Sequence, residues 1–455
     1  MIIVQRLARI PSHLRLGATV LGLKLGLSSL LLASPAFALD YTLDLFSGVE
    51  FTDNIDRLPD NQALEGYEAN IGSHIGLNHT GRKITLNAQY LAIYSDYKNN
   101  RIENNNEVTG SSDLAWQIID NRLTWNAEHY ISEVLSNNNR VNTPDNRERR
   151  QILTTGPTLT THLSSVDDLI FLAEYTQVNQ DDAINENLSQ RSNINSNRAE
   201  GVITWVHELS GTSALEVGGI GSETQFDNNS PDFKYQQIFI GYRVQLASGD
   251  YNIRLGTNQA KRSGPGDTEK GAYTAIEFNR EIKGDNLAIN IIRQLTDSSI
   301  GLDSDTSNTN INNFDTINIV ERTHFDINYT LQNICRGCVA NINYSFDHED
   351  FQNDISTSTS NRDNKDNRIA ATLDYRINSR LSSRTMASYL ITTFNELDRR
   401  DKTIEVETSL NWQLSEKLGL RAYLAYDNRD TNLDGLLDID YNASIAGITA
   451  TYTIK

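Results

Sequence analysis

The sequence has little of what helical membrane proteins and nucleic-acid-binding proteins need. Hydrophobic residues make up only 38 % of the 455 residues, and the formal net charge is −19. Beyond residue 38, no segment approaches the roughly 20 consecutive apolar residues of a membrane-spanning helix. The composition therefore excludes a helical membrane protein. The negative charge disfavours nucleic acid as a partner, because phosphate binding requires a basic surface.

The common sequence motifs of catalysis are also missing. The chain contains no G-x-S-x-G nucleophile elbow, no H-E-x-x-H zinc motif and no Walker loop for phosphate. Its histidines are scattered over separate segments rather than clustered. We therefore predict that the chain is not an enzyme and that it binds no cofactor and no metal.

Cysteine is nearly absent, with only Cys335 and Cys338 in the sequence Cys-Arg-Gly-Cys. A zinc site would need further ligands nearby, and a thioredoxin-like role would need a strand–helix–strand context that is lacking here. We predict a local disulfide bond across a turn, which implies an oxidising compartment. Two inert thiols are the alternative.

The first 38 residues have the three parts of a secretory signal peptide. Basic residues begin it, an apolar stretch follows around residues 20–32, and Ala36-Phe37-Ala38 supplies the small-x-small cleavage pattern. We expect the leader to be removed, so that the mature chain starts at Leu39. An uncleaved anchor is less consistent with Lys24, which interrupts the apolar stretch.

What the sequence has in abundance is alternation of apolar and polar residues with period two. In one segment the apolar phase carries Ile404, Val406, Thr408, Leu410, Trp412 and Leu414. Polar residues occupy every position between them. One face of such a strand suits lipid and the other suits water, and the pattern recurs about twenty times, which is typical of a transmembrane β-barrel.

The alternation predicts one domain, residues 39–455, with an all-β fold. We expect a closed antiparallel transmembrane β-barrel of about 20 strands, with 18 as the lower alternative. The predicted strands cover residues 41–52, 66–79, 83–96, 107–119, 122–134, 150–163, 167–178, 197–208, 212–225, 233–247, 250–261, 270–282, 286–297, 316–331, 338–350, 365–378, 381–395, 401–414, 418–429 and 439–453.

The connections between these segments alternate between short and long. Short Gly, Asn, Asp and Ser turns, such as Ser210-Gly211 and Asp120-Asn121, alternate with long polar loops, such as residues 179–197. Barrels of bacterial outer membranes have short periplasmic turns and long outer loops. Because the first and last connections are both long, we expect both termini on the periplasmic side and an even strand number. A soluble sandwich would not need so many strands, and a propeller would show a fixed repeat.

The polar phase of the strands predicts the residues that line the lumen. These candidates are Glu68, Glu128, Tyr130, Arg243, Arg254, Tyr273, Arg322, Asp326, Asp374, Arg376, Arg384, Glu405, Glu407, Arg421 and Tyr423. Their charges could pair and brace the wall, or could present a lumen in which neither sign dominates. The inward aromatics, Tyr130, Phe239, Tyr273 and Tyr423, could stack on sugars. Because Tyr41 opens the first strand directly after the cleavage site, a plug would have to be an inward-folded loop.

The first strand ends in Gly48-Val49-Glu50-Phe51-Thr52-Asp53-Asn54. A G-V-x-[YF]-T-D-N opening just after a signal peptide resembles the putative β-barrel porin 2 group, outer-membrane barrels of exopolysaccharide loci that include those associated with PEP-CTERM sorting. The resemblance implies an outer-membrane conduit or accessory in exopolysaccharide export, working with a periplasmic export partner. The chain departs from many barrels in ending at Lys455, one residue beyond the alternating Tyr452 and Ile454.

These observations leave three functions open. We expect an outer-membrane channel for a polysaccharide or oligosaccharide cargo, embedded in outer-membrane lipid and inserted by the barrel-assembly machinery. A general diffusion porin for small hydrophilic solutes is the first alternative. A non-transport surface protein is the second: either an adhesin or a structural barrel, with the long Asn- and Asp-rich loops as its binding element.

Overall fold

The structure of the chain is a computed structural model. It describes residues 39–98, 102–135, 142–180, 195–227, 231–263, 268–297, 319–332, 334–352, 363–395, 398–432 and 439–454. The predicted signal peptide, residues 1–38, lies outside the described residues. No helix within these ranges is both long and apolar enough to cross a membrane.

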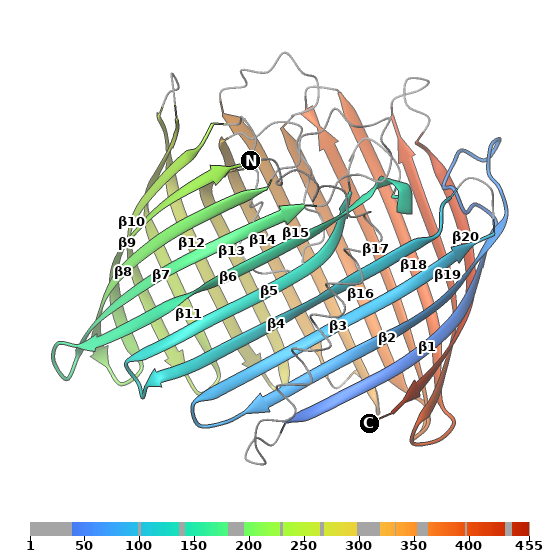
Figure 1. Cartoon of the computed structure of the whole chain (residues 1–455), viewed down its shortest axis with the longest axis horizontal. Coiled ribbons are helices and arrows are strands. Elements are labelled where there is room, and N and C mark those ends of the chain that lie inside the picture. Colours follow the sequence, from blue (N-terminus) through green and yellow to red (C-terminus); the bar gives the residue numbers. More distant parts are fainter. Residues whose placement is uncertain are drawn as a thin grey trace, which may run out of the picture.

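The described chain is almost entirely β-strand (Figure 1). One short 3-10 helix, η1 (Pro144–Asn146), interrupts the strand order. The strands are β1 (Asp40–Thr52), β2 (Gly66–Thr80), β3 (Ile84–Tyr97), β4 (Asn105–Ile119), β5 (Leu123–Leu135), β6 (Arg147–His162), β7 (Asp167–Gln180), β8 (Ser196–Ser210), β9 (Ser213–Phe226), β10 (Phe233–Leu246), β11 (Gly249–Arg262), β12 (Thr268–Ile282), β13 (Asp285–Asp297), β14 (Ile319–Leu331), β15 (Cys338–Gln352), β16 (Asn364–Arg376), β17 (Leu381–Phe394), β18 (Arg399–Gln413), β19 (Leu418–Thr431) and β20 (Tyr441–Thr453).

The strands form one 20-stranded sheet that closes on itself. Each strand pairs antiparallel with the next one in the sequence, and β20 pairs with β1 over Asp44↔Thr453 to Thr52↔Ile445. Closure leaves no edge strand with unpaired backbone groups, which is the condition for a sheet to cross lipid. The predicted closed barrel and its strand number are confirmed.

The connections alternate in length around the barrel (Figure 1). Two to six residues join the strands at one end, as at residues 211–212 and 283–284, whereas residues 53–65 and 298–318 join them at the other. Lys283 and Gly284 both have positive φ, 56° and 92°, as a two-residue type I′ hairpin turn requires. The first described residue and the last strand end both lie on the short-turn side.

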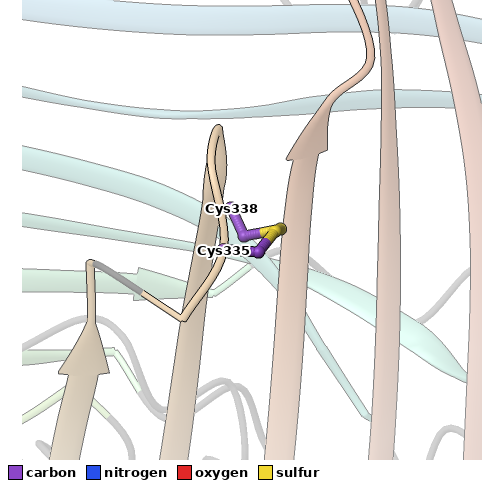
Figure 2. Close-up of a disulfide and its surroundings, with 2 residues drawn as sticks. All are labelled: Cys335 and Cys338. Carbon is purple, nitrogen blue, oxygen red and sulfur yellow. A yellow bond between two sulfur atoms is a disulfide. The ribbon is translucent and has the colours of Figure 1, made fainter.

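The cysteine pair lies at this short-turn end. Cys335 and Cys338 form a disulfide within the turn between β14 and β15 (Figure 2). The turn is closed by a hydrogen bond in which the Cys338 backbone N–H donates to the Cys335 carbonyl at 3.1 Å. The bridge therefore joins residues that the local backbone already holds together.

The outer wall presents the apolar phase of the strands. Large side chains on it are exposed because they face outward: Ile71, Ile203, Ile238, Ile240, Leu255, Ile369, Leu424 and Ile448 are among them. Exposed aromatic residues near the strand ends include Tyr67, Tyr94, Trp116, Trp412 and Tyr452. Such rings are typical of the two membrane–water interfaces. A continuous apolar outer face fits a barrel surrounded by acyl chains.

Candidate functional site

The inner face of the barrel is the surface on which the predicted site residues lie. Residues that pair directly across neighbouring strands share a face. The registers place all the predicted lumen-lining residues in the phase opposite to the exposed apolar residues, as Asp374↔Arg384 and Asn290↔Asp326 illustrate. The strands thus bring these side chains to one surface. Their role in conducting a solute stays a prediction.

Several charges on this inner face are paired with a charge of opposite sign. Arg254 Nε lies 3.0 Å from Glu216 Oε2, and Arg243 lies 3.6 Å from the other oxygen of the same carboxylate. Arg421 donates to Glu407, and Arg384 lies 3.8 Å from Asp374. Pairs of this kind brace neighbouring strands.

A second set of inner-face pairs lies on β14 and β15. Arg322 donates to Asp347 at 2.6 Å, and His324 Nδ1 lies 2.9 Å from the same oxygen. Sequence reasoning missed Asp347 and Glu216 as partners. Glu216 precedes Gly218, Gly219 and Gly221, and glycine carries no side chain to mark the alternation of the strand.

A row of three inner-face residues joins the strands at which the barrel closes. Tyr423 on β19 pairs with Gly447 on β20, which pairs with Glu50 on β1. The Tyr423 ring lies over Gly447, and its hydroxyl donates to the Glu50 carboxylate. Glycine at position 447 leaves the space that the ring needs to reach across β20 to β1. This contact fastens the last hairpin to the first strand.

The expectation that the inward aromatics stack on sugars is wrong for two of the four. Phe239 and Tyr273 are only 8 % and 9 % exposed. They pack with Ala275 in an apolar cluster, and the Phe239 ring lies against Gly218. A covered ring offers no face to a passing sugar. Tyr130 and Tyr423 are half-buried and keep part of their surface.

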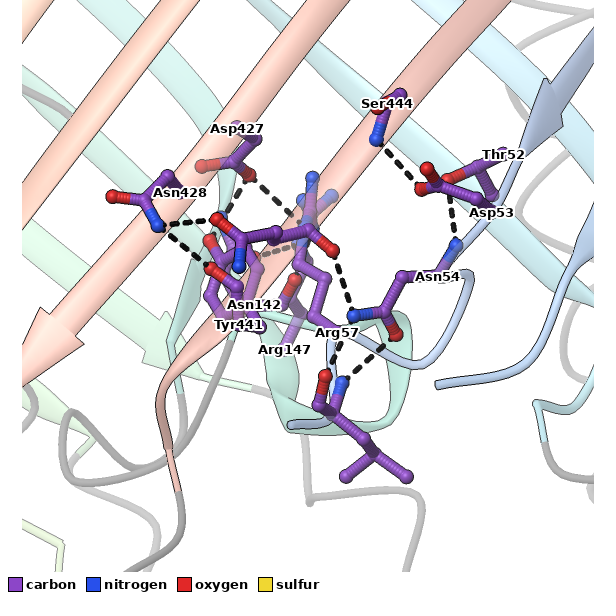
Figure 3. Close-up of polar contacts among 12 residues, drawn as sticks. Thr52, Asp53, Asn54, Arg57, Asn142, Arg147, Asp427, Asn428, Tyr441 and Ser444 are labelled. Carbon is purple, nitrogen blue, oxygen red and sulfur yellow. Dashed lines mark hydrogen bonds and ion pairs between the residues drawn. The ribbon is translucent and has the colours of Figure 1, made fainter. Parts of the chain in front are cut away.

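The long-loop end of the barrel, which we call the outer mouth, contains a polar cluster built on the loop between β1 and β2 (Figure 3). Asn54, which is 2 % exposed, donates to the carbonyl oxygens of Leu58 at 2.6 Å and Asn442 at 2.9 Å. The Leu58 N–H donates back to Asn54 Oδ1 at 3.0 Å. Asp53 accepts the backbone N–H of Ser444 at 2.7 Å. The Asp53-Asn54 pair therefore folds the first loop and ties it to β20.

Arg57 extends this cluster to two other parts of the barrel (Figure 3). Its Nε lies 3.1 Å from Asp427 Oδ2 on β19, and its Nη1 donates to the carbonyl of Asn142, ahead of β6. Tyr441 donates to the same Asp427 oxygen at 3.0 Å. Asn142 in turn accepts from Arg147 Nε at 2.8 Å. One guanidinium thus connects the first loop, β19 and the segment before β6.

In the part of the chain that the structure describes, neither the outer wall nor a cluster of metal-binding side chains offers a second candidate site. An apolar hollow of about 530 Å³ lies over β17–β20 and β1, but outward residues such as Leu410, Leu424 and Ile448 line it, so it opens to the lipid side. Within the described residues, no group of three or more His, Cys, Asp or Glu side chains is arranged to hold a metal ion. The lumen and its outer mouth are therefore the candidate site.

The comparison with protein families matches one part of the chain. Residues 356–452 match the family described as "Putative beta-barrel porin 2". These residues contain strands β16–β19 and nearly all of β20, and over them the predicted resemblance is confirmed. The Gly48–Asn54 motif lies outside the matched residues. No curated protein matches the sequence.

The chain is similar to several solved structures at low sequence identity. The FrpB iron transporter from Neisseria meningitidis (F5-1 variant) is 9 % identical, with a TM-score of 0.50 over 91 % of this chain and 82 % of that one. The siderophore receptor PirA from Pseudomonas aeruginosa is 12 % identical, with a TM-score of 0.43 over 90 % and 80 %. OccAB2 from Acinetobacter baumannii is 11 % identical, with a TM-score of 0.36 over 91 % and 98 %. At sequence identities this low, the similarity says nothing beyond the fold.

Proposed function

We propose, from the porin-family match of residues 356–452 and the closed barrel, that this chain is an outer-membrane channel for hydrophilic solutes. Its cargo in this proposal is an exopolysaccharide or oligosaccharide on its way out of the cell. The observation that carries the proposal is the division of the wall into an apolar outer face and a polar, charged inner face. Such a wall separates an aqueous path from lipid.

The balance of charge on the inner face supports a neutral or weakly charged cargo. Arg254, Arg243 and Glu216 form one paired group, and Arg421 with Glu407 forms another. Paired charges offer hydrogen-bond donors and acceptors without a strong net field. Hydroxyl groups of a sugar chain can exchange hydrogen bonds with such a surface at little cost in desolvation.

The route to the membrane completes the proposal. Residues 1–38 are the export signal, the mature chain begins at Leu39, and the barrel-assembly machinery inserts the chain. The strand ends at the short-turn side face the periplasm, where an export partner delivers the cargo. The disulfide between Cys335 and Cys338 lies at this end, which fits an oxidising periplasm. We propose no catalytic role and no cofactor.

Planar-bilayer recordings combined with a deletion strain test the proposal. We expect the purified mature barrel to conduct ions in steps, and the deletion strain to lose surface polysaccharide. Re-expression of the wild-type chain should restore the polysaccharide. A barrel that does not conduct, together with unchanged surface polysaccharide in the deletion strain, would rule the proposal out.

A general diffusion porin for small solutes is the second candidate. The inner wall is braced by its own ion pairs, so a channel of this kind can work without an export partner. Liposome swelling with sugars of graded size separates the two. A diffusion porin admits monosaccharides freely, and its deletion leaves surface polysaccharide unchanged. An export channel for a polymer requires both oligosaccharide passage and the surface phenotype.

A further inference from the structure

At the long-loop end of the barrel, two hairpins turn away from the barrel wall. In the β12–β13 ladder, pairing stops at Thr274↔Arg293, although β12 continues outward to Thr268 and stays paired with β11. In the β4–β5 ladder, pairing stops at Gly110↔Ile131, although β4 continues outward to Asn105 and stays paired with β3. Beyond these points β13 pairs only with β14, and β5 only with β6. We call these outer segments the β13–β14 arm and the β5–β6 arm.

The direction in which the β13–β14 arm turns is shown by Leu295. Leu295 belongs to the phase of Ile289 and Ile291, which is the outer phase of β13. A continued barrel wall would place it on the lipid side. Instead Leu295 is 2 % exposed, and it packs in a cluster with Phe233 and Ala260 from the inner face of β10 and β11. The face of the arm that would meet lipid in a continued wall therefore lies against the inner wall of the barrel.

Polar contacts under the arm agree with this placement. The Leu295 backbone N–H lies 2.9 Å from the side-chain amide of Asn258, an inner-face residue of β11 that is 2 % exposed. With its oxygen toward Leu295, that amide also donates to the Gly271 carbonyl at 3.1 Å. A Cβ at Gly271 would lie 3.0 Å from Leu295 Cγ. The arm thus crosses β12 where glycine allows a close approach, and it reaches β11.

The β5–β6 arm is held by polar contacts. Arg149, on β6, donates to the Asn106 carbonyl of β4 at 3.0 Å, across the position of β5. Beyond the end of β5, Asn142 contacts Arg57, which is paired with Asp427 on β19. β19 is the second strand behind β1 around the closure, so this contact reaches across β1–β4 and β20. Such a reach requires the arm to cross the mouth (Figure 3).

We propose that the two arms form a constriction at the outer half of the lumen and that this constriction sets the size limit for a passing solute. The inference rests on the proposed channel function. The apolar cluster around Leu295 fixes one arm, and the Arg57 contacts fix the other. Because pore diameter governs which solutes pass, a released arm widens the path.

The position of the β13–β14 arm can be tested without any transport measurement. We expect the Asn258→Cys/Leu295→Cys double variant to form a disulfide in the folded barrel, detected by peptide mapping apart from the native Cys335–Cys338 bridge. The Asn258→Cys/Leu287→Cys variant, with the second cysteine near the short-turn end of β13, should not cross-link. Equal cross-linking of both pairs, or none of the first, would overturn the inward placement.

Single-channel conductance and liposome swelling then test the size limit. We expect Leu295→Asn to raise conductance by about twofold or more and to admit larger sugars than wild type. The matched control is Leu390→Asn, the same change on the inner face of β17, away from both arms. We expect the oxidised Asn258→Cys/Leu295→Cys barrel to keep the wild-type limit. If the wild type conducts and Leu295→Asn has the same size limit for sugars, the constriction alone is overturned. If no variant conducts, the channel function is overturned as well.

Discussion

Arg57 and Asp427 form an ion pair of 3.1 Å between the loop after β1 and the wall of β19. Their positions are far apart in the sequence, and closure of the barrel brings them together. The pair is shielded, with side chains 26 % and 12 % exposed, and Tyr441 shares the same carboxylate oxygen. It therefore joins the two ends of the chain at the outer mouth.

Loss of this guanidinium should destabilise the barrel measurably. Arg57→Gln leaves the Asp427 carboxylate without its cationic partner, at an expected cost of about 1–3 kcal/mol. The matched control is Arg82→Gln, because Arg82 pairs with Asp120 in an exposed turn and its side chain is 85 % exposed. That change should cost at most about 0.5 kcal/mol. Urea unfolding in lipid vesicles measures both, and equal losses would contradict the importance of the mouth cluster.

Gly447→Ala should disturb the closure of the barrel. A Cβ at Gly447 would lie 2.3 Å from Tyr423 Cζ, so the ring would have to leave its place between β19 and Glu50. We expect a loss of about 1–3 kcal/mol, as for an overpacked site. Gly221→Ala is the control, because nothing lies within 4 Å of a Cβ there. The fraction of protein that migrates as folded barrel on unheated gels should fall for Gly447→Ala but not for Gly221→Ala.

A lumenal carboxylate should influence ion preference. The Glu405 side chain is 57 % exposed on the inner face, and Arg368 lies no nearer than 4.0 Å. Glu405→Gln removes a negative charge from the wall, so the cation-to-anion permeability ratio should fall. Reversal potentials in a salt gradient measure the ratio. Glu223→Gln, in the outer phase of β9, should leave it unchanged, and a shift there of the same size would argue against a lumenal origin.

The disulfide should form in the envelope and add little to stability. Cys335 and Cys338 are only three positions apart in the sequence, and a loop this short gives at most about 2 kcal/mol. We expect no thiol labelling of native protein without reductant and full labelling with it. The Cys335→Ser/Cys338→Ser variant should insert normally. Labelling of both thiols in untreated protein would contradict the bridge.

The strands could be predicted because their signal is local. Alternation within ten or more residues marks a strand and its two faces, and each predicted strand has a counterpart in the structure. The largest difference in boundary among the described residues is small: the strand predicted from residue 150 begins at Arg147. The start predicted at residue 316 lies outside the described residues, which resume at Ile319. The alternating connection lengths likewise predicted which ends of the strands share a side.

The constriction could not be predicted because its signal is not local. Alternation assigns Leu295 to the lipid side, and only the cluster with Phe233 and Ala260 reveals that the strand has turned inward. The pairing of Arg57 with Asp427 depends on closure of the whole barrel, and no single segment of the sequence indicates where the barrel closes. Glu216 was missed because the glycines that follow it hide the alternation of β9, and because both of its arginines lie on later strands.

The pairing of β20 with β1 limits how such a chain can change. Gain or loss of one strand would carry the C-terminal end to the opposite side of the membrane and leave parallel neighbours where the ring joins. A wider or narrower relative in which every pair of strands stays antiparallel must therefore differ by whole hairpins. Removal of either terminal strand alone yields an open sheet with two bare edges, prone to stick to other chains instead of forming a smaller pore.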